Sequence, residues 1–142
     1  MTHIIDYKAT QPAHKVNGKA LVIPHSPTRK RLASIQLRIP KRNSRKDTVE
    51  LIATVGVEGI SEISQILFRI FRDDIEIFNT QVWIESTDSE QFYAITFQAI
   101  DKNSRPGSRV YTLTVENLAN NTRADVVGPV SFSGLAIGQN SD

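Results

Sequence analysis

Hydrophobic residues recur at every second position over most of this chain, and that period constrains the fold more than any other feature. The alternation occurs at residues 33–39, 48–57, 66–71, 93–99 and 110–116. A period of two places one face of a strand in a core and the other face toward water. No segment of twelve or more residues has the 3.6-residue period of an amphipathic helix. The pattern therefore predicts an all-β protein.

Turn-forming residues separate these runs. Asp73 and Asp74 lie between two apolar runs at the spacing of a tight hairpin. Pro129 predicts a bulge or a sheet edge at the start of a last strand over residues 126–137. About eight short strands in one chain of this length are typical of a sandwich. We therefore predict a single-domain antiparallel β-sandwich, jelly-roll-like in its topology.

The composition narrows the possible chemistry. The chain has 142 residues and no Cys, which excludes disulfides, thiolate metal sites and thiol catalysis. It contains no nucleophile-elbow, P-loop or zinc-protease motif. We therefore predict that the protein is not an enzyme and needs no cofactor. The first residues lack the apolar region of a signal peptide and no run is long enough to span a membrane, so we expect synthesis in a cytoplasm and no membrane partner.

The formal net charge of +2 hides a strong division of charge along the chain. Residues 1–46 contain eleven Lys or Arg and one acid, a net charge of +10, whereas residues 47–142 have a net charge of −8. A basic front joined to an acidic body can bind an acidic partner or another copy of itself. We therefore expect a homo-oligomer, or docking onto a neighbouring protein.

The first 31 residues differ from the rest of the chain. They contain three prolines, scattered bases and one strand-like run at residues 20–23. Such a composition is typical of a terminus that is mobile until something docks it. We therefore predict a basic, partly extended N-terminal arm over residues 1–31 and a β-sandwich domain over residues 32–142.

Two basic clusters are candidate sites for electrostatic docking. Their residues are Arg29, Lys30, Arg31, Lys41, Arg42, Arg45 and Lys46. They can bind an acidic partner, or they can be solvated residues flanking an edge strand, where Lys and Arg discourage edge-to-edge aggregation. No aromatic residue interleaves these bases, and the rest of the chain is acidic, so nucleic acid is excluded as the expected partner. An acidic face of a second copy fits the clusters better.

The other candidate groups have simpler explanations. Trp83 is the only Trp, and it can serve as a sugar-stacking platform, although a half-buried core or interface residue is the favoured interpretation. His3, His14 and His25 are too widely spaced to converge on a metal, so we interpret them as surface histidines. Turn chemistry accounts for the acids outside the basic front that we considered as calcium ligands or paired carboxylates, namely Asp73, Asp74, Glu76, Asp88 and Glu90. No metal site is predicted.

Several strings of this sequence resemble one known family. They are Met-Thr-His-Ile-Ile-Asp-Tyr at 1–7 with Ala-Thr-Gln-Pro at 9–12, residues 49–59, 66–73 and 111–118, and Val-Val-Gly-Pro-Val-Ser-Phe-Ser-Gly at 126–134. Together they are similar to the exosporium protein C family of the Bacillus cereus group. The likeness is most specific in the first twelve residues and at 127–134, and it is weakest over the basic stretch at 29–46.

The resemblance implies a structural, non-enzymatic role in the exosporium, the outermost protein layer of the spore. It implies synthesis in the mother-cell cytoplasm, deposition on the spore surface, and contacts with other copies and with exosporium or spore-coat proteins. A lectin-like or host-surface binding module that uses Trp83 is the alternative. An enzyme of the spore surface, such as an esterase, has no residue in this chain to support it.

Overall fold

The computed structural model describes residues 2–16, 20–41, 45–86, 92–102 and 105–140, with the backbone alone at 45–46 and 139–140. All regular structure in that part of the chain is β-strand. The strands are β1 (Thr2–Ala13), β2 (Leu21–Val22), β3 (Lys30–Ile39), β4 (Arg45–Ser61), β5 (Ile63–Arg72), β6 (Ile75–Glu85), β7 (Phe92–Asp101), β8 (Gly107–Asn117) and β9 (Arg123–Asn140). Within the described ranges, no helix is long and apolar enough to cross a membrane.

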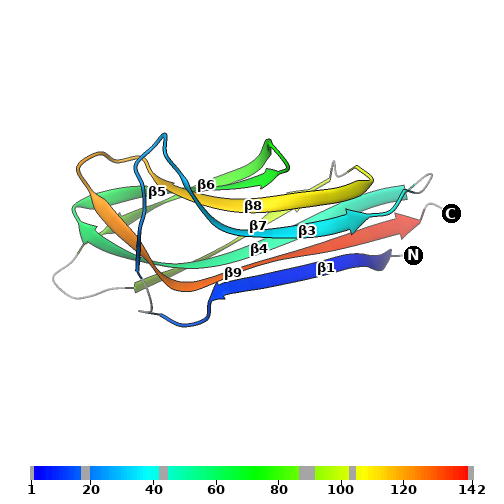
Figure 1. The fold of residues 1–142 in the computed structure, drawn as a ribbon, viewed down its shortest axis with the longest axis horizontal. Coiled ribbons are helices and arrows are strands. Elements are labelled where there is room, and N and C mark those ends of the chain that lie inside the picture. The colour runs from blue at the N-terminus through cyan, green and yellow to red at the C-terminus, as the bar shows by residue number, and fades with distance from the viewer. Residues whose placement is uncertain (1, 17–19, 42–44, 87–91, 103–104, 141–142) are drawn as a thin grey trace.

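The strands form two antiparallel sheets that pack as a sandwich, with both chain ends at the same end of the molecule (Figure 1). Sheet A has the order β1-β9-β4-β7, with β2 beside β9, and sheet B has the order β3-β8-β5-β6. The pairs are nested along the chain: β5 with β6, β4 with β7, β3 with β8 and β1 with β9. Successive pairs alternate between the sheets, which is the arrangement of a jelly roll. The predicted fold class is confirmed.

The core lies between the sheets and is built from the inward positions of each alternating strand. On β4 these positions run from Val49 to Val57, and all five of the inward side chains are fully buried. They face Phe68 and Leu113 from sheet B, which are equally buried. Burial of each large apolar side chain contributes about 1.5–3 kcal/mol, so the alternation seen in the sequence is the main source of stability.

The N-terminal segment differs from the predicted division into an arm at 1–31 and a sandwich at 32–142. β1 forms the edge of sheet A, and β2 pairs with β9 at Val126 and Asp125. The next residue, Ile23, is fully buried in the core. A bulge between Ile4 and Asp6 breaks the period of β1, and an edge strand tolerates polar side chains, so this strand lacks a clean alternation. The sandwich therefore includes most of the segment predicted as an arm.

The bulge in β1 joins the two sheets at one side of the sandwich. Asp6 turns toward β3, and its Oδ2 accepts a hydrogen bond from the backbone N–H of Arg38 at 2.9 Å. Its Oδ1 accepts the N–H of Tyr7 and lies 3.7 Å from Lys8 Nζ. The hydrogen bond from Arg38 is the main reason that the pKa of Asp6 lies below its ordinary value. This carboxylate accepts the hydrogen bond of the Arg38 N–H, a backbone donor that the edge strand β3 would otherwise expose.

Two predicted turns are found in the structure. Asp73 and Asp74 separate β5 from β6, and Asp73 has the positive φ of 54° that a tight turn requires. The bulge predicted at Pro129 lies where the pairing of β9 with β4 shifts, between Val55 and Val57. The bulged backbone presses on Gly56, where an added Cβ would lie 1.9 Å from the Gly128 carbonyl oxygen. Only glycine fits at this position of β4.

Candidate functional site

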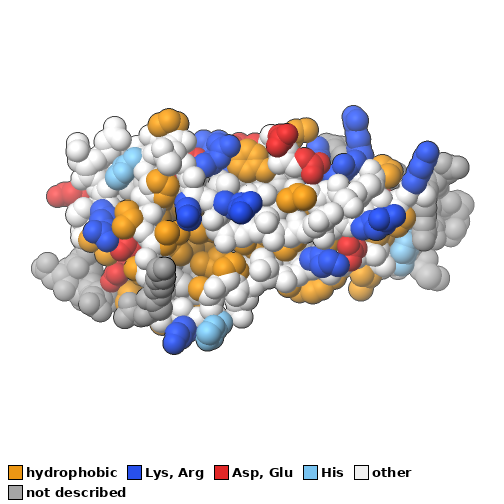
Figure 2. All heavy atoms as spheres, in the orientation of Figure 1, with side chains coloured by type: hydrophobic (Ala, Val, Ile, Leu, Met, Phe, Trp, Pro, Cys, Tyr) orange, Lys and Arg blue, Asp and Glu red, His pale blue; other side chains and the backbone are white. Residues whose placement is uncertain are grey.

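The predicted docking cations gather around one edge strand. Arg29 precedes β3, Lys30 and Arg31 begin it, and Lys41 follows it. Figure 2 shows Lys and Arg side chains along the part of the surface where Figure 1 places β3 and β1. β3 is an edge of sheet B, so these bases flank an edge strand as predicted. Arg42 lies outside the described residues, as do the side chains of Arg45 and Lys46.

These cations are not neutralised within the molecule. We use the name β3 cation row for the exposed bases Arg29, Lys30, Arg31, Arg38 and Lys41. Within the ranges that the structure describes, none of them forms an ion pair. The Arg29 guanidinium instead lies over the ring of Phe71, with its carbon 4.6 Å from the ring centroid. The row therefore presents a positive surface to solvent.

The arginines of the acidic body behave in the opposite way. Arg72 donates to Asp101 at 2.7 Å, and Arg123 donates to Asp125 at 3.0 Å. Arg109 Nη1 lies 3.6 Å from Asp73. Body acids are thus paired with body arginines, and the charge division of the sequence persists on the folded surface.

A network of ion pairs covers the outer face of sheet B. Glu116 on β8 is 2% exposed, and its carboxylate accepts hydrogen bonds from Arg69 Nε at 2.6 Å and from the Ser26 hydroxyl. Arg69 also donates to Glu76, which accepts a second bond from Asn79 Nδ2 at 3.0 Å. The hydrogen bond from Arg69 is the main cause that lowers the pKa of Glu76. The charged side chains of this network therefore bond to one another and stabilise the fold.

The outer face of sheet A has a different composition. Register places Tyr7, Leu135, Glu50 and Ile100 in one row across all four strands. The six larger apolar side chains around this row form what we call the apolar A face: Ile4, Tyr7, Ile52, Ile100, Leu135 and Ile137. Ile4 is 69% exposed and Tyr7 is 57% exposed. Sequence analysis missed this face because its residues come from four strands that are distant along the chain.

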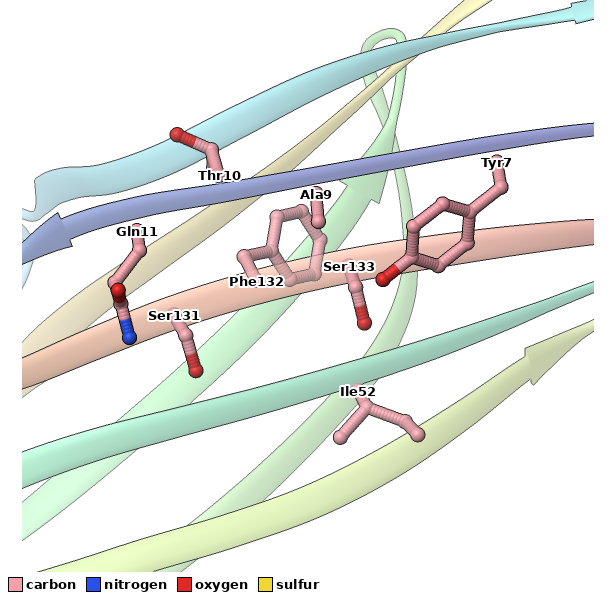
Figure 3. Close-up of a pocket in the computed structure, with 8 residues that line it drawn as sticks. All are labelled: Tyr7, Ala9, Thr10, Gln11, Ile52, Ser131, Phe132 and Ser133. Carbon is pink, nitrogen blue, oxygen red and sulfur yellow. The ribbon is translucent and has the colours of Figure 1, made fainter.

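A shallow hollow of about 370 Å³ lies on this face between β1, β9 and β4. Figure 3 shows Tyr7, Gln11, Ser131, Ser133 and Ile52 projecting from the same side of the sheet. The residues that line the hollow carry no charge. Its polar side-chain groups are the hydroxyls of Tyr7, Thr10, Ser131 and Ser133 and the amide of Gln11.

Trp83 lies on the outer face of β6, the second edge of sheet B, and is 66% exposed. The interpretation as a half-buried core residue is therefore wrong, because the indole has most of its surface in water. Its cross-strand neighbour is Gln65, and Ile63 and Leu118 are exposed close by. Trp83 remains a candidate contact aromatic for an interface or for a ligand.

His25 differs from the predicted surface histidines. The ring is half-buried, and its Nε2 lies 2.7 Å from the Thr122 carbonyl oxygen, which holds the segment that leads into β3. No group of three or more potential metal-ligating side chains occurs among the residues that the structure describes. Of the acids that we assigned to turns, Asp73 and Asp74 lie in the β5–β6 hairpin, Glu76 is ion-paired, and Asp88 and Glu90 lie outside the described residues.

Comparisons with known proteins found matches among solved structures alone. No family model matches the chain, and no curated protein matches it. Among solved structures, the chain is similar to VP2 in a subviral particle of infectious bursal disease virus, with a TM-score of 0.36, 7% identity, and coverage of 94% of this chain and 40% of that chain. A mutant VP2 of the same virus gives a TM-score of 0.35, 9% identity, and coverage of 94% and 39%. This chain thus spans about 40% of the length of the VP2 chains.

Proposed function

We propose that this protein is a non-enzymatic structural component of the bacterial spore exosporium that docks onto other copies and onto neighbouring exosporium or spore-coat proteins. One observation carries the docking role. The β3 cation row forms no ion pair within the described ranges, whereas four arginines of the acidic body are paired with acids. The resemblance of the sequence to the exosporium protein C family supports the proposed location on the spore surface.

Acidic residues that can pair with the β3 cation row of another copy lie near the opposite edge of sheet B. Glu62 and Glu85 are exposed where β5 begins and β6 ends, and their segments are joined by a backbone hydrogen bond from Ser86 N to the Glu62 oxygen at 3.0 Å. β3 and β6 are the two edges of sheet B. Contact between the row of one copy and this acidic corner of the next is head-to-tail, and such contacts propagate into extended arrays. A surface layer requires an array of this kind.

Charge reversal tests the docking role. We expect the wild type to form assemblies larger than a dimer at about 50 mM salt and to lose them at about 1 M salt, because salt screens exposed charges. Lys30→Glu combined with Arg31→Glu should abolish these larger assemblies. Lys102→Glu, an exposed body cation, is the matched control and should associate normally. The measurement is mass by light scattering. Assemblies larger than a dimer that resist both molar salt and charge reversal would contradict the proposal.

The location is tested separately. An antibody against the chain, applied to thin sections of spores from the organism that encodes it, should label the outermost layer. A label confined to the mother-cell cytoplasm or to the inner coat would exclude the exosporium as its place of action. This result does not depend on how the copies associate.

The exposure of Trp83 favours a second candidate function, a lectin-like module that stacks a sugar on the indole. A glycan array with the wild-type protein should then show binding that Trp83→Ala removes. Tyr7→Ala, which deletes an exposed aromatic on the other sheet, is the control and should bind normally. An array without any signal from the wild type would exclude this candidate.

A further inference from the structure

We propose that the outer face of sheet A is a second interface, through which two copies of this chain stack sheet against sheet. The inference rests on the proposed function, because it concerns the same self-assembly, but it assigns a surface that the charge division does not involve. The occupant is a second copy of this chain.

The first argument is the absence of cations. Arg123 and Asp125 form an ion pair at one end of this face, where Asp125 pairs in register with Glu58. Around the apolar A face itself, the described outward residues of β1 and β7, and those within 48–56 of β4 and 131–137 of β9, include no Lys or Arg, and Glu50 is their only charged residue. Solvent-facing sheets carry Lys and other charges that keep the protein soluble and protect exposed strands. A face that lacks them, in a chain with 17 Lys and Arg, has the composition of an interface centre, where charged residues are depleted.

The second argument is the content of the face. Six larger apolar side chains lie in neighbouring rows, and three of them, Ile4, Tyr7 and Ile100, have more than half of their surface in water. Rows of hydroxyl groups lie beside them, including Ser131, Ser133 and the mutually bonded Thr54 and Thr96. Hydroxyls both donate and accept hydrogen bonds, so a second copy of the same face can satisfy them.

The third argument is area. Four strands about 4.8 Å apart, each with about five outward residues about 6.7 Å apart, give about 600 Å² for each copy. A pair of copies would therefore bury about 1,200 Å², which reaches the lower end of the range for stable interfaces. Sheets stack face to face at about 10 Å in many proteins, so this contact needs no new geometry.

Charge excludes the other occupants. An acidic protein would be repelled by Glu50 and Glu58 and would meet the β3 cation row instead. An anionic membrane surface attracts Lys and Arg, which the described outward residues around the apolar A face lack. In a two-fold stack whose axis runs between β9 and β4, β4 of one copy lies over β9 of the other. Glu50 then faces the strand that carries Ser131 and Ser133 rather than the Glu50 of the second copy.

The test uses one isoleucine from each sheet. Ile52 on β4 is 45% exposed on the apolar A face, and Ile63 on β5 is 47% exposed on the outer face of sheet B. Both strands are inner strands of their sheets. At about 1 M salt, which screens the cation row, sedimentation should show dimers for the wild type and for Ile63→Lys. Ile52→Lys should be monomeric, with a Kd at least about 100-fold weaker, because each lysine would be buried without a partner.

A dimer unchanged by Ile52→Lys, or a wild type that is monomeric at about 1 M salt, would overturn the inference. If Ile52→Lys fails to fold, Tyr7→Lys tests the same face. This substitution should disturb folding less, because β1 is an edge strand and β4 is an inner strand of sheet A. The two proposals fail separately. Larger assemblies that are lost in high salt, with no dimer left at about 1 M salt, leave the cation row and remove this interface. A dimer at about 1 M salt that Ile52→Lys breaks, without larger assemblies at about 50 mM salt, leaves this interface and removes the cation row.

Discussion

The two sheets have the same antiparallel pairing, yet their outer faces satisfy their side chains in opposite ways. On sheet B, Arg69 joins Glu116 and Glu76, and Arg29 lies over Phe71. On sheet A, Tyr7, Ile52 and Ile100 lie exposed beside hydroxyl groups, with no cation among the described outward residues around them. The centre of the outer face of sheet B pairs its charges internally, so its groups for a partner lie at its edges, in the β3 cation row and at Glu62 and Glu85. The face without such a network is the one that gains most from contact.

The largest effect is expected where the two strands of sheet A approach most closely. Gly56→Ala would place a methyl group against the bulged backbone of β9 at Gly128. Backbone cannot rotate away as a side chain does, so we expect the free energy of unfolding to fall by about 3 kcal/mol, measured by urea denaturation. Thr54→Ala, two residues earlier on the same face, should cost under about 1 kcal/mol. Equal effects of the two substitutions would mean that the bulge moves freely.

A pair of glutamates compares the faces directly. Glu116→Gln removes a buried charge that holds Arg69 and Ser26, and we expect a loss of about 2 kcal/mol in the free energy of unfolding. Glu50→Gln on sheet A should change it by under about 0.5 kcal/mol, because Glu50 has no ion pair within the described part of the chain. Similar values for the two variants would show that the network on sheet B does not stabilise the fold.

Acid should weaken sheet B in particular. The pKa of Glu76 is lowered in the folded protein by the hydrogen bond from Arg69. A carboxylate of this kind contributes stability above its unfolded pKa of about 4.3, and that stability is lost as pH falls through the folded value. Since the pair is partly exposed, we expect Glu76→Gln to remove only about 0.5 kcal/mol at pH 7. The variant should match the wild type near pH 2, and a constant difference from pH 7 to pH 2 would contradict this linkage.

The smallest effect is expected on the exposed hydroxyls of sheet A. Thr54 and Thr96 share a hydrogen bond of 2.9 Å across β4 and β7. Thr96→Ala should lower the free energy of unfolding by under about 0.5 kcal/mol, because water replaces the lost partner. A loss above about 1 kcal/mol in urea denaturation would show that this face has an internal network of its own.

Much of the fold was predictable because the burial of each strand alternates. The runs at 33–39, 48–57 and 110–116 appear in β3, β4 and β8 with their apolar residues inward. β1 was missed, since its bulge and its place at the edge of sheet A remove the period from the sequence. The apolar A face could not be predicted, because no sequence pattern within a single strand indicates that Tyr7 and Ile100 lie in the same row as Leu135. Long-range register decides that, and single-strand periodicity does not contain it.

The candidate residues divide in the same way. The β3 cation row was visible in the sequence as Arg29, Lys30, Arg31 and Lys41, because charge runs are local. The sequence did not show that the row has no ion-pair partner within the described ranges. That depends on the fold, in which acids such as Asp101 and Asp125 pair with Arg72 and Arg123. The surroundings of Trp83 likewise depend on its position at an edge strand, which is a property of the whole sheet.

The nested order of strand pairs also implies a folding sequence. The β5–β6 hairpin closes across two residues, and each later pair joins strands whose neighbours are already held, so no step requires the closure of a long free loop. Pairing of Thr2 with Gln139, the most distant in the chain, then becomes the last and a nearly local event. The rows that contain Tyr7 and Leu135 exist only after that event. A chain in which β1 has not yet paired with β9 therefore cannot present the apolar A face. Assembly through the interface that we propose there is restricted to molecules that have completed their fold.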